Sequence, residues 1–541
     1  MKKYIFVTGG VCSSLGKGLA SASLGTLLEN RGFSVCMIKI DPYINVDAGT
    51  MSPYQHGEVY VTDDGAETDL DLGNYARFTH SPLSAAHSIT TGQIYDAVIR
   101  KEREGKFLGK CVQVVPHITD EIKRRILSLG EKPEIEITIV EIGGTVGDIE
   151  SIPYLEAVRQ IIHEKGHGVA LSVHLTLVPT VTGGEVKTKP TQHSVKEMRE
   201  IGIQPDVLLC RCQEELPADL KRKISQFTNI DHDCVLSAHD VDTTIYEIPV
   251  VYHHQGMDEV VCRKLGLRSR KSKITNTWGR LADIHKNSKT TVNIAMVGKY
   301  IELADAYKSV DEALVHGAFA NEVRLKLTKV DSEDIEQKIA AGETLDEFFA
   351  PYDGILIPGG FGSRGILGMV QTARFAREKK IPCFGICLGL QIMVIEYSRS
   401  ILGLKDADSS EFRPEGNNSV ISLLEEQVDV TAYGGTMRLG LSESHVNEGT
   451  HMFKAYGSTT IHERHRHRYE VSNSYREALS EAGLILSGTT PDGSLVESVE
   501  WPDHPWGVGV QFHPEFTSSP IKAGPLFKDF ILHSLKNSGK K

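Results

Sequence analysis

A cysteine in a glycine-rich turn is the strongest candidate nucleophile in this sequence. Cys387 is the centre of the G-x-C-x-G pattern at 385–389, which follows an apolar run and precedes a predicted helix. Such a turn exposes the sulfur, and the N-terminus of the helix behind it favours the thiolate. His513 and Glu515, in FHPEF, also follow an apolar run. We expect His513 to act as the base and Glu515 to orient its imidazole.

The turn PGGFG at 358–362 follows another apolar run and can supply backbone N–H groups to an oxyanion hole. Taken singly, each motif has a simpler interpretation, since most buried cysteines are inert and a lone H-x-E is common. Three such elements at three strand ends favour a cysteine-histidine-glutamate site. We interpret the other cysteines as packing residues.

A second group of residues is suited to binding phosphate. The segment GGVCSSLGKG at 9–18 lies between an apolar run and a helical pattern. Backbone N–H groups and Lys17 are predicted to bind the phosphates of a nucleotide there. The match to GxxxxGK[ST] is imperfect, because Val11 replaces the first glycine and Gly18 replaces the hydroxyl residue that would contact Mg²⁺. The alternative is a plain tight turn, but a Gly-Lys pair at this junction favours the phosphate loop.

Without that hydroxyl, a bound Mg²⁺ must take its protein ligands from carboxylates elsewhere. Asp71 lies in DGAETDLDLG, a segment too acidic and glycine-rich to be core, and Glu141 ends the apolar run ITIVE. We predict that both are metal ligands, whereas Asp69 alone fits a solvated loop better. Lys39, at the end of another apolar run, could place positive charge near a transferred phosphoryl group.

Two further basic segments have two interpretations each. KTKPTQ at 187–192 groups two lysines and two hydroxyls around a proline. It is either a second phosphate-binding cluster or a basic surface turn. The run HRHRY at 465–469 lacks the spacing of metal ligands. Recognition of a carboxylate by Arg468 and a solvated loop remain equally open for it.

The elements that must position these residues are short apolar strands that alternate with helices. Near-continuous apolar strands are typical of parallel sheets covered by helices on both faces, and ligands bind at the carboxyl ends of such strands. The predicted fold is therefore α/β, with two doubly wound parallel-sheet domains at 1–266 and 291–541 joined by a polar linker at 267–290. The predicted strands lie within the segments 4–10, 35–41, 137–145, 168–180, 205–212 and 234–241, and then 291–300, 324–331, 352–360, 381–389 and 507–516.

Composition narrows the class of protein. The 541 residues are 40% hydrophobic and carry a formal net charge of −12, which is typical of a globular enzyme and disfavours a nucleic-acid binder. The sequence contains no run of eighteen apolar residues, so we expect no transmembrane helix. Its N-terminus does not have the pattern of a secretory signal. The nine scattered cysteines suit a reducing compartment, so we expect a cytoplasmic protein.

Taken together, these motifs closely resemble those of the CTP synthases over nearly the whole chain, and the second half alone resembles a class I glutamine amidotransferase. The resemblance implies an N-terminal P-loop-like amidoligase, a C-terminal glutaminase, and the reaction ATP + UTP + glutamine → ADP + phosphate + CTP + glutamate. The motifs that carry it are YIFVTGGVCSSLGKG, KIDPYINVDAGTMSP, HGEVYVTDDGAETDLDLGNY, VEIGGTVGDIES, GEVKTKPTQHS, MVGKYIELADAYKS, PGGFGSRG, GICLGLQ, RHRHRYEV and QFHPEF.

The resemblance also implies roles for individual residues. The glutaminase triad is Cys387, His513 and Glu515, and the Mg²⁺ ligands are Asp71 and Glu141. ATP contacts are implied for Ser14, Leu15, Gly16, Lys17, Gly18, Leu19, Asp71, His239, Asp240 and Val241. Contacts with UTP or with the product CTP are implied for Ser13, Asp148, Ile149, Glu150, Lys187, Thr188, Lys189, Pro190, Thr191, Gln192 and Lys223. Glutamine contacts are implied for Gly360, Leu388, Gly389, Leu390, Gln391, Glu411 and Arg468.

Further properties follow from the same resemblance. It implies Mg²⁺ as cofactor, GTP as an activator bound near Arg364 and 434–440, CTP as a feedback inhibitor, and a homotetramer that can form filaments. It also implies an internal path for ammonia between the domains. Two rival classes share part of the pattern: cobyric acid synthase-like amidoligases, which would not need KTKPTQ, and partitioning ATPases, which would not need the Cys387 triad.

Overall fold

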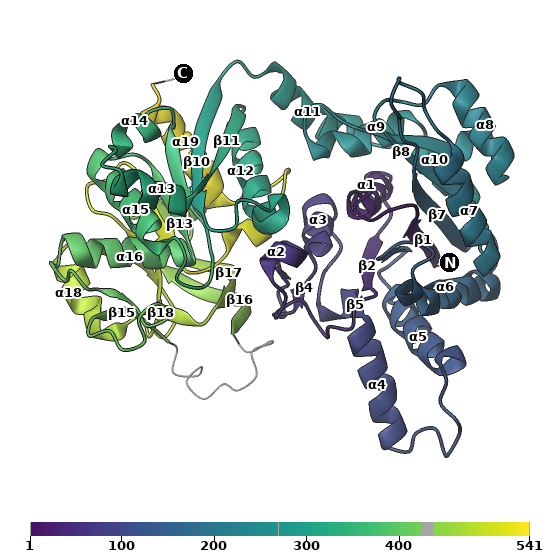
Figure 1. Ribbon diagram of the computed structural model, residues 1–541, viewed down its shortest axis with the longest axis horizontal. Coiled ribbons are helices and arrows are strands. Elements are labelled where there is room, and N and C mark those ends of the chain that lie inside the picture. The colour runs from purple at the N-terminus through teal and green to yellow at the C-terminus, as the bar shows by residue number, and fades with distance from the viewer. Residues whose placement is uncertain (1, 269, 424–436, 540–541) are drawn as a thin grey trace. The chain divides into compact units, whose positions relative to one another are not determined.

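The computed structural model describes residues 2–268, 270–423 and 437–539 and divides into two compact units (Figure 1). The first consists of Met1–Ala48 and Asp71–Asp283, and the second of Gly49–Leu70 and Ile284–Lys541. The domain boundaries at 266/267 and 290/291 stay a prediction. The contacts add that a segment near the N-terminus, residues 49–70, packs with the second unit.

The first unit contains a seven-stranded sheet with the order β5-β2-β6-β1-β7-β8-β9, in which every pairing is parallel. This confirms the predicted doubly wound sheet. The strand order reverses around β1, and the turn that follows β1 is therefore placed where such sheets bind ligands. The strands are β1 (Lys3–Gly9), β2 (Val35–Asp41), β5 (Ser88–Thr90), β6 (Ile137–Ile142), β7 (Ala170–Leu177), β8 (Val207–Cys212) and β9 (Val235–His239).

Helices bury the apolar strands of the first sheet. On one face, Phe6 and Val140 of the sheet form a core with Ile122 and Ile126 of α5 and Val158 of α6. Burial on both faces explains why these strands lack polar alternation. The helices of this unit are α1 (Lys17–Asn30), α3 (Leu70–Phe78, whose first residue belongs to the second unit), α4 (Thr91–Arg103), α5 (Thr119–Gly130), α6 (Ile152–Lys165), α7 (Lys189–Ile201), α8 (Ala218–Thr228), α9 (Ile248–His254), α10 (Met257–Lys264) and α11 (Ile274–Asn287, which runs on into the second unit).

The second unit contains a nine-stranded sheet with the order β11-β10-β12-β13-β21-β20-β19-β16-β17. The five strands predicted from the sequence, β11 to β21 in this order, pair in parallel, and the other four add antiparallel. The sheet strands are β10 (Thr291–Gly298), β11 (Arg324–Asp331), β12 (Gly354–Ile357), β13 (Cys383–Ile386), β16 (Arg438–Val446), β17 (Thr460–His467), β19 (Ile485–Thr489), β20 (Val496–Glu500) and β21 (Gly507–Val510).

The remaining elements of the second unit are short strands and helices. The short strands are β3 (Tyr60–Val61), β4 (Glu67–Thr68), β14 (Asp408–Ser409), β15 (Ser419–Leu423) and β18 (Tyr469–Val471). The helices are α2 (Pro53–His56), α12 (Lys308–Ala320), α13 (Ser332–Ala340), α14 (Leu345–Phe349), α15 (Ile366–Lys379), α16 (Leu388–Ser400), α17 (His451–Tyr456), α18 (Arg476–Glu481) and α19 (Pro525–Asn537).

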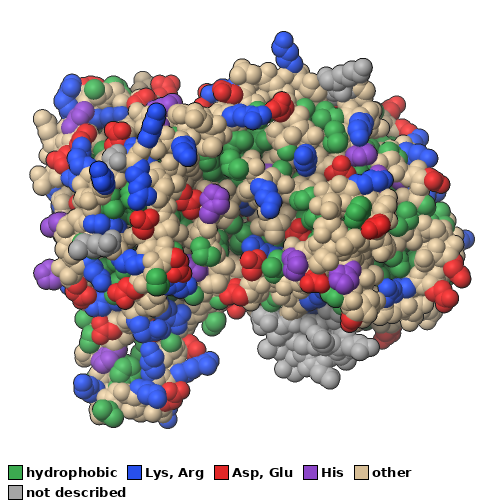
Figure 2. Space-filling model, turned by 180° about the vertical axis from the view of Figure 1, so that it is seen from behind, with side chains coloured by type: hydrophobic (Ala, Val, Ile, Leu, Met, Phe, Trp, Pro, Cys, Tyr) green, Lys and Arg blue, Asp and Glu red, His purple; other side chains and the backbone are tan. Residues whose placement is uncertain are grey.

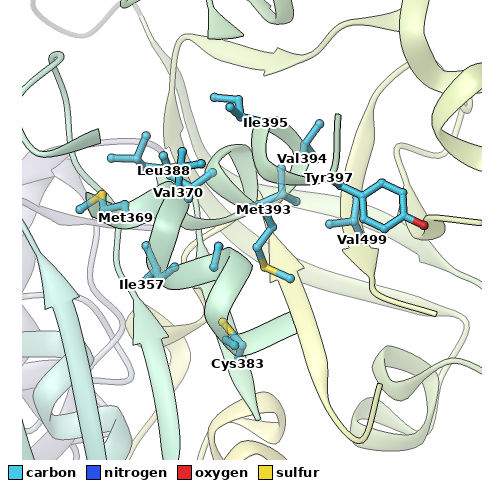
Figure 3. Close-up of a cluster of buried hydrophobic side chains, with 14 of the residues drawn as sticks. Ile357, Met369, Val370, Cys383, Leu388, Met393, Val394, Ile395, Tyr397 and Val499 are labelled. Atoms are coloured by element: carbon cyan, nitrogen blue, oxygen red, sulfur yellow. The ribbon is translucent and has the colours of Figure 1, made fainter. Parts of the chain in front are cut away.

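Two separate cores flank the second sheet. Alternate residues of β10 point to opposite faces, so that Val297 joins a core with α13, α15 and α16, whereas Ile294 joins one with α12 and α19. Figure 3 shows the first of these cores, where Met393 and Ile395 of α16 lie among side chains of α15 and of the sheet. This core fixes α16, the helix that begins directly after Cys387.

Over most of the face seen in Figure 2, Lys and Arg side chains are interspersed with Asp and Glu. Among the described residues, none of the helices has the length and apolar character needed to cross a membrane.

The core beneath α16 predicts the cost of a cavity. Ile395 is fully buried, and we expect Ile395→Ala to lower the free energy of unfolding of the second unit by about 2–5 kcal/mol. Leu367→Ala, at a side chain 51% exposed on the neighbouring helix α15, should change it by less than about 0.5 kcal/mol. Urea unfolding followed by tryptophan fluorescence measures both, and equal effects would contradict the assignment of this core.

Candidate active sites

Cys387 occupies a strained strand-to-helix turn between β13 and α16. Its backbone has φ 54° and ψ −101°, a conformation that L-residues rarely adopt. The turn is tight, because a Cβ on Gly389 would lie 2.1 Å from the carbonyl oxygen of Ile357. The backbone N–H of Cys387 donates to the carbonyl of Val510 at 2.7 Å. The predicted elbow is therefore present, and it is fixed by neighbouring strands.

The structure brings His513 and Glu515 to this turn. They follow β21, which pairs with β13, and His513 Nδ1 lies 2.7 Å from Glu515 Oε1. A Cβ on Gly359 would lie 3.2 Å from His513 Cε1 and 3.6 Å from Cys387 Cβ, so these residues meet around the turn after β12. Burial opposes charge on His513, but the carboxylate of Glu515 and the sulfur of Cys387 outweigh it and raise the pKa of His513 to about 10.

A cavity of about 80 Å³ adjoins these groups and is lined by Cys387, His513 and Glu515 together with Gly359 and Gly360. Part of the glycine turn is already engaged. The N–H of Phe361 donates to Tyr300 Oη at 3.2 Å, and that of Gly362 donates to Glu411 Oε1 at 2.6 Å. Gly359 and Gly360 of this turn line the cavity, so their backbone N–H groups are candidates to bind an oxyanion.

The residues expected to contact glutamine fall into four places, one of which is Glu411, the acceptor of the Gly362 N–H. Gly360 lines the cavity. Leu388, Gly389, Leu390 and Gln391 form the buried first turn of α16, where Gln391 Nε2 donates to the carbonyl of Tyr469 at 3.1 Å. Arg468 lies in the short connection between β17 and β18. The solvated-loop interpretation of the HRHRY run is wrong for 465–467, because these residues belong to β17 and both histidines are buried.

Sequence reasoning missed the contribution of residues 49–70 to this site. Gly57, Glu58 and Val59 line the cavity. Glu58 Oε2 accepts from the backbone N–H of Ser309 at 2.8 Å, and Arg466 Nε donates to Glu67 Oε1 at 2.9 Å. Two features of the sequence could have indicated this contribution: the HGEVY motif at 56–60 and the alternation of arginine with histidine at 464–467.

The phosphate loop in the first unit is also strained and tightly packed. Val11, Ser14 and Gly16 have positive φ values of 78°, 59° and 92°. Lys17 begins α1, its Nζ donates to the carbonyl of Gly144 at 2.8 Å, and burial lowers its pKa. A neighbour that the sequence did not reveal is His174, a buried residue hydrogen-bonded to Ser194 beside this loop.

The carboxylate of Asp71 explains the missing hydroxyl at position 18. A Cβ on Gly18 would lie 1.8 Å from Asp71 Oδ1, so the carboxylate occupies the space that a side chain would need. Lys39 Nζ contacts both Asp71 and Glu141, at 3.2 Å from Glu141 Oε1. Burial would raise the pKa of Asp71, but the Lys39 ammonium lowers it, whereas burial and the neighbouring Asp71 raise that of Glu141. Carboxylate oxygens that already hold an ammonium cation are donors of the kind that Mg²⁺ takes, so these residues are compatible with Mg²⁺.

The other residues expected to bind nucleotides mostly follow the carboxyl ends of strands in the first sheet. Ser13, Ser14, Leu15 and Leu19 follow β1; Asp148, Ile149 and Glu150 follow β6; Lys187, Thr188, Lys189, Pro190, Thr191 and Gln192 follow β7; His239, Asp240 and Val241 end or follow β9. Lys223 does not follow the end of a strand, because it lies on helix α8. Its ammonium group interacts electrostatically with Glu185, the ion-pair partner of Lys187.

Comparisons with known proteins agree with both halves. The family described as CTP synthase N-terminus matches residues 3–267, and glutamine amidotransferase class-I matches residues 302–532. The CTP synthase of Geobacter sulfurreducens is 54% identical over 540 residues, covering 100% of this chain and 99% of the relative. That of Carboxydothermus hydrogenoformans is 53% identical, covering 99% of each. A solved structure described as the Trypanosoma brucei CTPS glutaminase domain with bound acivicin is 39% identical, with TM-score 0.43, covering 46% of this chain and 95% of that one.

Fold, elbow and family matches define a glutamine amidotransferase joined to an α/β synthase unit. The identity to the curated relatives extends over the full length of both chains. The chain belongs to the CTP synthase family, as the sequence motifs predict.

The contact between Gly18 and Asp71 predicts that restoring the standard phosphate-loop residue is harmful. We expect Gly18→Ser to lower ammonia-dependent CTP formation about 100-fold, because the new Cβ displaces the Asp71 carboxylate. Steady-state assays with ATP and UTP measure this loss. Ser23→Ala, at a buried residue on the same helix whose hydroxyl has no hydrogen-bond partner among the described residues, should keep the rate within about twofold. A Gly18→Ser enzyme as active as the parent would contradict this account of position 18.

Proposed function

We propose that this protein makes CTP from UTP by using ammonia that Cys387, His513 and Glu515 release from glutamine. ATP, UTP and glutamine are the substrates that membership of the CTP synthase family implies. The observation that carries the proposed roles is the meeting of a strained cysteine elbow with a buried histidine-glutamate pair in one cavity. The reaction serves pyrimidine nucleotide synthesis.

In the glutaminase half, the sulfur of Cys387 forms a bond to the amide carbon of glutamine. The amide nitrogen leaves as ammonia and takes a proton from His513, which gives a glutamyl thioester. Water then attacks the thioester, His513 accepts its proton, and glutamate leaves with the sulfur restored. Glu515 keeps the imidazole oriented and favours its protonated form. Backbone N–H groups of Gly360 and Leu388 are proposed to bind the oxyanion, whereas Gln391, Glu411 and Arg468 are proposed to orient the substrate.

In the synthetase half, the phosphate loop and Lys17 bind ATP. Its terminal phosphoryl group is transferred to O4 of the uracil ring of UTP, ADP leaves, and the N3 proton of the ring is lost. Ammonia then attacks C4, phosphate leaves with O4, and a proton is lost to solvent. Asp71 and Glu141 would hold Mg²⁺, which neutralises phosphate charge when bound. Lys39, already between these carboxylates, is suited to offset charge on the transferred group.

The remaining nucleotide contacts are proposed on the basis of the family motifs and the shared sheet edge. Residues 13 and 187–192 with Lys223 would bind UTP, residues 148–150 would bind inhibitory CTP, and residues 239–241 would lie beside the adenine of ATP. We also propose activation by GTP near Arg364 and 434–440, of which 434–436 lie outside the described residues.

Transfer of ammonia inside the protein has a chemical reason. Ammonia released into water at neutral pH is mostly protonated and no longer nucleophilic, so an enclosed path between the domains preserves its reactivity. We further propose a homotetramer in the cytoplasm. The substrates of the enzyme are small molecules, and we propose no nucleic-acid or membrane partner.

Substitution of the nucleophile tests the division of labour between the two halves. Cys387→Ala should lower glutamine-dependent CTP formation by at least about 10⁴-fold and leave ammonia-dependent formation within about twofold of the parent rate. The absorbance change on conversion of UTP to CTP measures both. Cys383→Ala, at a buried thiol four residues earlier whose pKa is raised by burial, is the matched control and should retain both activities. Loss of both activities in a folded Cys387→Ala protein would refute the mechanism.

Substitution of the phosphate-loop lysine tests the other half. Lys17→Ala should lower CTP formation from either nitrogen source by about 10²–10³-fold, because the charge that faces the transferred phosphoryl group is lost. ADP release measured beside CTP formation reports the step directly. Lys196→Ala, at an exposed lysine of α7, should be silent. Ammonia-dependent synthesis that persists in Lys17→Ala would show that ATP binds elsewhere.

A further inference from the structure

Strand β17 contacts both members of the catalytic pair through its backbone. The backbone N–H of His513 donates to the carbonyl of Arg464 at 2.7 Å. Two residues further on, the carbonyl of Arg466 faces Cys387 Sγ at 4.0 Å. A small displacement of β17 along its axis would therefore move the base and change the surroundings of the sulfur together.

The opposite faces of β17 are held by different groups. Arg464 and Arg466 point toward residues 49–70, where Arg464 Nε donates to Asp63 Oδ1 at 2.7 Å and Arg466 pairs with Glu67. His465 and His467 alternate with them and are buried, as the period of two in a strand requires. The buried face of β17 is thus polar at His465 and His467, in addition to Glu463, where apolar side chains would be ordinary.

Three charged residues from three other strands surround the two histidines. Arg438, the first residue of β16, donates to Glu470 of β18 at 3.0 Å and to Glu497 of β20 at 2.6 Å. His465 Nδ1 and His467 Nε2 are 3.0 Å apart. His465 Nε2 lies 3.4 Å from Glu497 Oε2, and His467 Nδ1 lies 3.5 Å from Glu470 Oε1. We call these five residues the β17 cluster.

Burial of the β17 cluster in the core costs desolvation free energy. Both carboxylates and both histidines are almost wholly shielded from solvent, and several of their polar atoms have no hydrogen-bond partner among the described residues, including His465 Nε2 and Glu497 Oε2. Burial lowers the pKa of both histidines and raises that of Glu470 to about 8. A protein with apolar residues of similar volume at these positions would often be at least as stable. What hydrogen bonds and ion pairs add is a fixed register, because their geometry tolerates little sliding.

We propose that the β17 cluster is a positioning network for glutamine cleavage: it fixes the register of β17, and through the carbonyls of Arg464 and Arg466 it holds His513 against Cys387. None of the five residues reaches the cavity, so they act through the catalytic pair. This inference rests on the proposed roles of Cys387 and His513.

Neutralising one carboxylate without changing its shape tests the proposal. Glu497→Gln weakens the ion pair with Arg438 and the contact with His465. We expect glutamine-dependent kcat to fall about tenfold or more, while KM for glutamine and ammonia-dependent CTP formation stay within about threefold. Alkylation of Cys387 by iodoacetamide should slow in parallel with kcat. The pH dependence of kcat should keep its shape, because His513 and Glu515 are unchanged.

A second variant and a matched control separate positioning from folding. Arg438→Lys keeps the charge but loses the two-armed bridge between β18 and β20, so it should reproduce the fall in kcat. His462→Asn lies on the exposed face of the same strand and should leave every readout unchanged.

Two results would overturn the proposal: Glu497→Gln and Arg438→Lys enzymes that hydrolyse glutamine at the parent rate, or a loss of ammonia-dependent synthesis equal to the loss of glutamine-dependent synthesis. Failure of the underlying triad is distinguishable, because Cys387→Ala would then still hydrolyse glutamine.

Discussion

Close backbone approach at two strand-to-helix turns is the constraint on which both sites depend. After β13, a side chain on Gly389 would collide with the backbone of Ile357, and Cys387 itself is held at a positive φ. After β1, a side chain on Gly18 would collide with Asp71. In each half, the reacting groups can converge only because glycine leaves room for a neighbouring strand end or carboxylate.

The two sites use buried charge in opposite ways. In the first unit, an ammonium group lies among carboxylates, so that Lys39 keeps Asp71 ionised while Glu141 is pushed toward its neutral form. In the second unit, one carboxylate lies beside one imidazole and stabilises its cationic form. The first arrangement suits the exchange of one cation for another, and the second suits the transfer of a proton.

The sequence predicts the parallel strands well, because apolar runs that end in glycine and polar residues are a local signal. The same signal places Cys387, His513 and Glu515 at neighbouring strand ends, where the structure brings them together. The sequence predicts the antiparallel half of the second sheet poorly. In β17 the buried positions are Ile461, Glu463, His465 and His467, and a hydrophobicity pattern cannot recognise a strand whose inward residues are largely polar. The glycine at position 18 allows carboxylate metal ligands to be predicted from the sequence. The contact by which Asp71 excludes a side chain at that position could not be predicted.

Residues 49–70 pack with the second unit, although residues on both sides of them belong to the first. During synthesis, this segment leaves the ribosome long before β10, β16 and β17 exist. At that stage the groups that Glu58, Asp63 and Glu67 bind in the folded chain have not yet been synthesised. The second unit can therefore reach its full set of contacts only after both residues 49–70 and its C-terminal strands have been synthesised.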